Sequence, residues 1–309
     1  MRPIVWPDGK RFAFSIFDDP DSQTWEAGRA IYGALRDLGF RTTKAVWPQG
    51  PVREASDHGL TCAAEGYVPW AQELAAAGFE AGYHCATSHT SFREETRQGL
   101  ERFEAIFGHA PKTAANHYFC DENLYWGADR LSSWRRAAYN CLTRFQHAGR
   151  YHGHQPGHPL FWGDLAQEKI TYLRNFVFSD INCFNSCPFL PYHDPARPFV
   201  NQWYCATEGS NFGNFCQTMT DEAMDRLEAE GGLCIMYVHF GHQFYEDGRV
   251  QPAFLRIMER LARKNGWFAP VGTILDYIRA QRGDHRITDD ERALLERRWL
   301  WHKVRYGSA

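Results

Sequence analysis

Residues 11–21 read Arg-Phe-Ala-Phe-Ser-Ile-Phe-Asp-Asp-Pro-Asp, and this stretch decides how the rest of the chain is interpreted. Its apolar run is typical of a short buried strand, which ends at two adjacent carboxylates, Asp18 and Asp19. Pro20 stops the strand because it has no N–H to donate to a neighbouring strand. Paired carboxylates at the end of a buried strand are unfavourable unless a cation neutralises one of them. A metal ion could do so, whereas the alternative interpretation is a solvated turn.

Strand-like and helix-like patterns alternate along most of the chain, at the spacing expected of βα units with parallel strands. Strands are predicted at 12–17, 40–47, 79–84, 170–178, 233–238 and 267–270, and helices at 24–40, 68–77, 91–107, 221–230, 253–264 and 271–280. Residues 111–165 show neither pattern and are interpreted as irregular. With 309 residues, the chain is the right length for a distorted (β/α) barrel of about seven parallel strands.

The last part of the chain has a different pattern. Thr288 and Glu291 form the sequence signature of a capping box, which predicts that a helix begins there. Its apolar residues favour packing on the barrel or on a partner. We therefore expect a barrel at residues 1–283 and a C-terminal amphipathic helix at 284–309 that packs on it.

Composition and charge exclude several classes of function. A formal net charge of −3 gives no electrostatic basis for binding nucleic acid. No run of 18 apolar residues predicts a membrane span, and the N-terminal residues do not resemble a signal peptide. The nine cysteines contain no Cys-x-x-Cys pair and are interpreted as reduced. These features predict a cytoplasmic protein.

Polar residues follow three of the predicted strands directly. Asp18 and Asp19 follow the first, His84 follows the strand at 79–84, and His239 follows the strand at 233–238. In parallel α/β folds, the carboxyl ends of strands converge on one face, where catalytic residues lie. A second histidine, His89, lies five residues beyond His84. Imidazoles together with a carboxylate suit Zn²⁺ or another first-row divalent ion.

The order of these residues resembles the polysaccharide deacetylases, the NodB-homology family known as carbohydrate esterase family 4. Phe-Asp-Asp-Pro at 17–20, a histidine pair followed by Ser or Thr, and Tyr-Val-His at 237–239 match that family's pattern over about residues 10–280. The resemblance implies a NodB-like barrel in which Asp18 is the catalytic base and His239 the general acid. It also implies that Asp19, His84 and His89 bind Zn²⁺, or instead Co²⁺, Ni²⁺ or Mn²⁺.

The sequence departs from the family's pattern at two places. The family usually spaces its two histidines four residues apart, whereas His84 and His89 are five apart. The segment in which the family carries an arginine that pairs with the base reads Lys-Thr-Ala-Ala-Asn-His-Tyr at 112–118, so Arg174 is predicted as the substitute. The Ala-Asn-His motif is similar to an uncharacterised bacterial branch of the family. The predicted substrate contacts are Asn116, His117, Tyr118, Asp164, Arg174 and His242.

The activity implied by the resemblance is metal-dependent removal of an N-acetyl group from an N-acetylated sugar or surface polysaccharide. Two other hypotheses remain open. One is hydrolysis of another non-peptide amide, such as a cyclic amide or imide, on the same fold. The other is a catalytically inactive barrel that binds carbohydrate; the presence of Asp18, Asp19 and His239 argues against it.

Overall fold

Seven parallel strands close into a barrel in the computed structural model, which describes residues 3–307. Each strand pairs with the next, and β7 pairs with β1 from Ala13 to Asp19 to close the ring. A further short strand, β10 (Gly266–Phe268), pairs with the beginning of β1. The barrel strands are β1 (Phe12–Asp19), β2 (Thr43–Val46), β3 (Glu80–Tyr83), β4 (Thr113–Ala114), β5 (Tyr172–Phe178), β6 (Gln202–Glu208) and β7 (Leu233–His239). The predicted fold class is confirmed.

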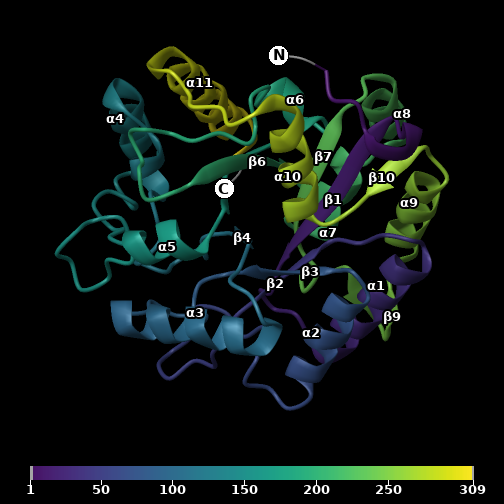
Figure 1. Cartoon of the computed structure of the whole chain (residues 1–309), viewed down its shortest axis with the longest axis horizontal. Helices are drawn as coiled ribbons and strands as arrows, with labels where there is room; N and C mark the ends of the chain where they lie inside the picture. The colour runs from purple at the N-terminus through teal and green to yellow at the C-terminus, as the bar shows by residue number, and fades with distance from the viewer. Residues whose placement is uncertain (1–2, 308–309) are drawn as a thin grey trace.

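Helices surround these strands (Figure 1). They are α1 (Trp25–Asp37), α2 (Tyr67–Ala76), α3 (Arg93–Phe107), α4 (Ser133–Leu142), α5 (Gly163–Lys169), α6 (Cys183–Ser186), α7 (Phe212–Thr218), α8 (Asp221–Ala229), α9 (Pro252–Ala262), α10 (Val271–Arg282) and α11 (Asp289–Tyr306). Two 3-10 turns, η1 (Pro7–Gly9) and η2 (Gly127–Arg130), and a hairpin of β8 (Tyr245–Glu246) and β9 (Arg249–Val250) complete the fold. Among residues 3–307, no helix combines the length and apolar character needed to cross a membrane.

The apolar run at the start of the chain is buried along its whole length, as its composition predicts. Every residue of β1 is buried, and α1 covers this part of the barrel with Ile31, Tyr32 and Leu35. Thr24 caps α1 by accepting a hydrogen bond from the amide of Ala27 at 3.3 Å. Burial of each large apolar side chain stabilises the fold by roughly 1.5–3 kcal/mol. The fixed position of β1 in turn fixes the carboxylates at its end.

The interpretation of residues 111–165 as irregular was wrong. This segment contains β4, α4 and the start of α5. α4 escaped detection because its apolar residues Trp134 and Leu142 are exposed, whereas its buried residues are Arg135 and Tyr139. The strand β4 has only two residues, which is too short for a hydrophobic pattern. β6 was also not predicted.

The C-terminal helix α11 shares buried contacts with the barrel. Its capping box forms as predicted, with Glu291 donating its amide to the Thr288 hydroxyl at 3.2 Å. Glu296 on this helix is fully buried and accepts hydrogen bonds from Arg135 at 2.6 Å and Arg197 at 3.2 Å. The two segments on either side of the predicted boundary after residue 283 are therefore joined by buried ion pairs.

Candidate metal centre

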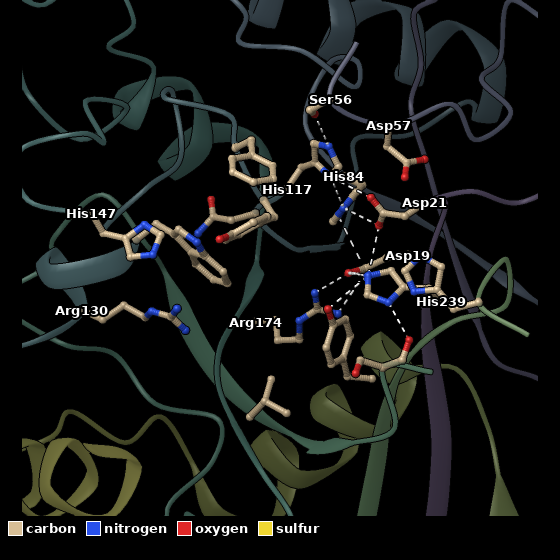
Figure 2. A pocket seen from close by; sticks show the side chains of 18 of the residues that line it. Asp19, Asp21, Ser56, Asp57, His84, His117, Arg130, His147, Arg174 and His239 are labelled. Carbon is tan, nitrogen blue, oxygen red and sulfur yellow. Dashed lines mark hydrogen bonds and ion pairs between the residues drawn. The ribbon is translucent and has the colours of Figure 1, made fainter. Parts of the chain in front are cut away.

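A pocket of about 500 Å³ opens where the carboxyl ends of the barrel strands meet. Asp19 ends β1 and His239 ends β7, and the two residues are directly paired in the sheet register. His84 follows β3 by one residue, and His117 follows β4 by three. Figure 2 shows these side chains directed toward one another within the pocket. The structure thus brings together the three strand ends that the sequence singled out.

The adjacent carboxylates Asp18 and Asp19 point in opposite directions. Successive residues of a strand face opposite sides of the sheet, so only one of them can face the pocket. Asp18 faces away from it, within 3.1 Å of Lys44 Nζ, and accepts hydrogen bonds from the Tyr32 hydroxyl and the amide of Phe240, each at 3.0 Å. Burial raises the pKa of Asp18, and Lys44 offsets part of this effect. Asp18, the predicted catalytic base, therefore does not line the pocket.

Asp19 faces the pocket and is held by Arg174. The guanidinium of Arg174 donates to both carboxylate oxygens, at 3.0 and 2.5 Å, and both side chains are buried. Arg174 also lies over the ring of Tyr237, 4.1 Å from its centroid. A bidentate pair of this kind fixes the orientation of the carboxylate. Arg174, the predicted substitute for the family's arginine, thus pairs with Asp19 and not with Asp18.

Asp21, His84 and His117 form a compact group of potential metal ligands. His117 Nδ1 lies 2.9 Å from Asp21 Oδ1 and 3.1 Å from His84 Nε2, and His84 Nε2 lies 3.5 Å from Asp21 Oδ2. Ligand atoms about 2.0–2.1 Å from a tetrahedral zinc ion are separated by roughly 3.3 Å. The observed distances, two of which run to different oxygens of Asp21, are close to this separation, so the three side chains fit a first-row divalent ion.

Hydrogen bonding around His117 supports the same conclusion. The Ser56 hydroxyl donates its only hydrogen to the carbonyl of Ser88 at 2.6 Å, so at 2.9 Å from His117 it accepts the Nε2–H. In the neutral imidazole, Nδ1 then has a lone pair directed at the Asp21 carboxylate. Two acceptors 2.9 Å apart require a second proton on His117 or a cation between them. An outer hydrogen bond that fixes the tautomer is typical of metal-binding histidines.

Asp21 is an anion in this environment. Burial alone would raise its pKa, but the adjacent imidazoles of His117, His239 and His84 outweigh that effect and hold the pKa well below its usual range. The pKa of His84 is lowered, chiefly by burial, which favours the neutral imidazole that a metal ion requires. One Asp21 oxygen and His84 Nδ1 are buried without a hydrogen-bond partner among residues 3–307.

His239 lies beside both acids of the pocket. Its Nδ1–H donates to the carbonyl of Ser210 at 2.7 Å, so Nε2 faces the pocket, 3.2 Å from Asp21 and 3.8 Å from Asp19. Burial lowers the pKa of His239, but the adjacent carboxylates of Asp21 and Asp19 dominate and raise it to about 9. Asp19, Asp21 and His239 are also close enough to share a metal ion. The guanidinium bound to Asp19 makes that position less favourable for a second cation.

His89 does not join the cluster. Its Nε2 accepts a hydrogen bond from the amide of Val52 at 3.2 Å, and its Nδ1 lies 3.4 Å from Arg53. It lines a different cavity, beside Glu95 and Thr87. The chain between His84 and His89 is neither helix nor strand, so no regular geometry brings the two imidazoles to one side. The structure thus overturns the prediction that His89 is a ligand at this centre.

The remaining predicted residues divide into two groups. Asn116, Tyr118 and His242 line the pocket, in agreement with their predicted place. Asn116 also holds the following loop, since its amide donates to the carbonyl of Leu124 at 3.0 Å. Asp164 lies outside the pocket on the surface, where Arg93 donates to both its oxygens at 2.6 and 2.7 Å. The predicted substrate contact at Asp164 is therefore not supported.

Sequence reasoning gave no role to Asp21 and placed His117 among the substrate contacts. Asp21 lies beyond Pro20, outside the strand, so the strand-end argument did not cover it. His117 follows a strand that is too short to recognise from its pattern. The motif Ala-Asn-His itself was the available signal, because a histidine just beyond a parallel strand lies at the same edge as the other strand ends.

Solved structures of other proteins share this fold. No protein-family model and no curated protein sequence matches the chain. A Mycobacterium smegmatis protein, provisionally named a polysaccharide deacetylase, matches with a TM-score of 0.54 and 16% identity over 93% of this chain and 97% of its own. A Pseudomonas aeruginosa PAO1 protein, also provisionally named a polysaccharide deacetylase, has a TM-score of 0.52, 13% identity and coverage of 91% and 95%. PuuE allantoinase has a TM-score of 0.51, 14% identity and the same coverage. The chain therefore shares the fold of these structures, which is the NodB-like barrel that the sequence resemblance implied.

Proposed function

We propose that this NodB-like barrel is a metal-dependent hydrolase that removes an N-acetyl group from an N-acetylated sugar or surface polysaccharide. The observation that carries the proposal is the triangle of Asp21, His84 and His117 beside the Arg174-held carboxylate of Asp19. The two groups share one pocket with His239. A metal centre with a neighbouring acid and imidazole is the arrangement needed to hydrolyse an amide with activated water.

Relative to the roles implied by the family resemblance, the base moves by one position along the first motif and the carboxylate ligand moves by two. In that family an arginine pairs with the catalytic base, and in this chain the arginine is Arg174 and its partner is Asp19. We therefore assign Asp19 as the base and Asp21 as the carboxylate ligand. Asp18 becomes a buried structural residue that pairs with Lys44.

Asp21, His84 and His117 would hold Zn²⁺, or another first-row divalent ion such as Co²⁺, Ni²⁺ or Mn²⁺. When bound, such an ion supplies Lewis-acid activation of an amide carbonyl and of water. Asp19 accepts a proton from the water that attacks the carbonyl carbon, and Arg174 keeps its carboxylate in position. His239 Nε2 donates a proton to the departing amine, so the products are acetate and a free amino sugar.

The environment of His239 suits a proton donor. Its Nδ1–H is committed to the carbonyl of Ser210, so Nε2 is the ring nitrogen that can donate a proton in the pocket. A pKa of about 9 keeps the imidazole protonated at neutral pH. A cation at Asp21 would offset part of that carboxylate's charge and lower this pKa, toward the range in which a general acid works efficiently.

The test combines metal analysis with substrate hydrolysis. Purified protein is loaded with zinc or cobalt, and acetate release is measured on N-acetylglucosamine oligomers and other N-acetylhexosamines. We expect about one equivalent of metal and acetate release that chelation abolishes. Asp19→Asn should lower the rate of release about 10²–10⁴-fold, whereas the matched control Asp164→Asn, which changes an exposed carboxylate outside the pocket, should not change it.

Each alternative has its own outcome in this experiment. Hydrolysis of a cyclic amide or imide such as allantoin, without acetate release from any sugar, would replace the deacetylase proposal by amide hydrolysis of another kind. Sugar binding without turnover by the metal-loaded protein would indicate an inactive carbohydrate-binding barrel. A metal content below about 0.2 equivalents would contradict the metal centre itself, because a site with three protein ligands should be nearly filled under these conditions.

A further inference from the structure

Arg130 is a buried cation for which the proposed mechanism has no use. It lies at the end of η2 and lines the same pocket, with only 3% of its surface exposed. Figure 2 shows its side chain directed into the pocket from the side opposite His239, with Arg174 between them. The end of the pocket that Arg130 faces is thus separate from the metal centre.

The contacts of Arg130 leave most of its hydrogen-bonding capacity unused. Its guanidinium lies 3.7 Å from the ring centroid of Trp126 and 4.5 Å from that of Trp299. The carbonyl of Asn175 is 3.5 Å away, at the outer limit of a hydrogen bond, and Nε is buried without a partner among residues 3–307. Among residues 3–307, no carboxylate forms an ion pair with Arg130. Burial lowers the pKa of Arg130 to about 10.

The other buried arginines among residues 3–307 each have a carboxylate partner, which Arg130 lacks. Arg174 pairs with Asp19, Arg135 with Glu296, and Arg197 with both Asp194 and Glu296. Contacts with aromatic rings offset only part of the penalty for burying an unpaired guanidinium. A planar guanidinium that presents its N–H groups to a pocket is suited to bidentate binding of a carboxylate or phosphate.

We propose that Arg130 binds an anionic oxygen group of the substrate, a sugar carboxylate or a phosphate ester. The inference rests on the proposed function, because it places the sugar between the metal centre and Arg130. Trp126 and Tyr139 also line the pocket, so it combines this cation with aromatic side chains. The substrate class is thereby narrowed to acidic N-acetylated sugars.

Titration calorimetry on the full-length protein tests this inference without turnover. The probes are glucuronate, glucose 6-phosphate and glucose, and each titration is repeated after chelation because a resident metal also binds anions. We expect at least one anionic probe to bind about tenfold or more tightly than glucose. The reason is that a charge-assisted bidentate contact is stronger than a hydrogen bond between neutral groups. The two anionic probes separate a carboxylate preference from a phosphate preference.

Three variants locate the effect. Arg130→Met should abolish the preference for the anionic probe, and Arg130→Lys should retain part of it because the charge remains. Arg144→Met, which removes one exposed cation from the nearby connection after α4, is the matched control and should bind as the wild type does. Anion binding by Arg130→Met at wild-type affinity would overturn the proposal, and so would equal affinities of the wild type for glucose and both anions.

These experiments distinguish a failure of the anion site from a failure of the proposed deacetylase function. If Arg130→Met fails to give a cooperative melting transition, the affinities of the wild type and of Arg130→Lys for the three probes decide the question. Arg130-dependent anion binding without acetate release from any acidic or neutral sugar would contradict the deacetylase proposal alone. Equal acetate release from neutral and acidic N-acetylated sugars would contradict the anion site alone.

Discussion

The contrast between His117 and His89 gives the sharpest test of the metal centre. His117 Nδ1 lies within 3.1 Å of both other ligand candidates, whereas His89 is engaged by the amide of Val52. We expect His117→Ala to lose the metal and His89→Ala to keep it. This outcome would reverse the expectation from the family's histidine pair, in which His89 is a ligand.

Metal binding should raise the melting temperature by an amount set by its binding free energy. A metal present at about 1,000 times its dissociation constant stabilises the folded state by roughly 4 kcal/mol. At about 2.1 cal/mol/K per residue, the 309 residues have an unfolding entropy of roughly 0.65 kcal/mol/K. The expected rise in Tm on adding zinc is therefore about 6 °C for the wild type and for His89→Ala. It should be close to zero for His117→Ala, which retains only two ligands.

A third variant tests the hydrogen bond that fixes the tautomer of His117. Ser56→Ala removes the acceptor 2.9 Å from Nε2 and leaves all three ligands in place. Loss of such an outer contact typically weakens metal binding 10–100-fold, so the zinc-dependent rise in Tm should fall by about 2–4 °C. Zinc content by mass spectrometry and melting curves with and without chelator give both readouts. Full metal content in His117→Ala, or loss of metal in His89→Ala, would refute the assignment.

Three further predictions concern the buried acids Asp19, Asp18 and Glu122. Asp19→Asn should lower the rate of acetate release about 10²–10⁴-fold because it removes the base, with metal content unchanged; a wild-type rate would exclude Asp19 from that role. Asp18→Asn should lower the free energy of unfolding by about 3–5 kcal/mol, because Lys44 is then buried without its partner, and the double variant with Lys44→Met should recover most of this loss in urea titrations. Full stability of Asp18→Asn would contradict the buried pair. Burial raises the pKa of Glu122 from 4.5 to about 8, so its contribution to stability is complete below pH 4.5 and is lost as the pH rises toward 8, by roughly 4 kcal/mol. Glu122→Gln should flatten this dependence, and an unchanged slope would show that another group causes it.

Much of the fold could be predicted because its strands are short apolar runs followed by helices of regular periodicity. β1, β7 and α11 correspond closely to their predicted segments. α4 could not be found in this way, since Arg135 on its buried face is stabilised by Glu296, 161 residues further along the chain. A polar residue that is buried through a distant ion pair looks exposed in a local sequence pattern.

The candidate site could be predicted only in part, for a related reason. The sequence correctly indicated that Asp19, His84 and His239 would meet, because all three end or follow strands. It could not show which of the adjacent acids faces the pocket. The alternation of side chains along β1 decides that, and its phase depends on the closure of the barrel against β7.

The arrangement of strands also explains why the second histidine of the cluster is His117 and not the predicted His89. β3 and β4 are neighbours in the barrel, with Tyr83 paired to Ala114 and the amide of Ala115 donating to the carbonyl of Tyr83 at 3.0 Å. The residues just beyond the two strands therefore lie side by side, although 33 positions separate His84 from His117. A metal ion requires only that its ligands converge in space, and two adjacent strand ends provide this as well as two positions of one loop. A ligand spacing read along the chain is consequently a weaker constraint on this centre than the order of strands around the barrel.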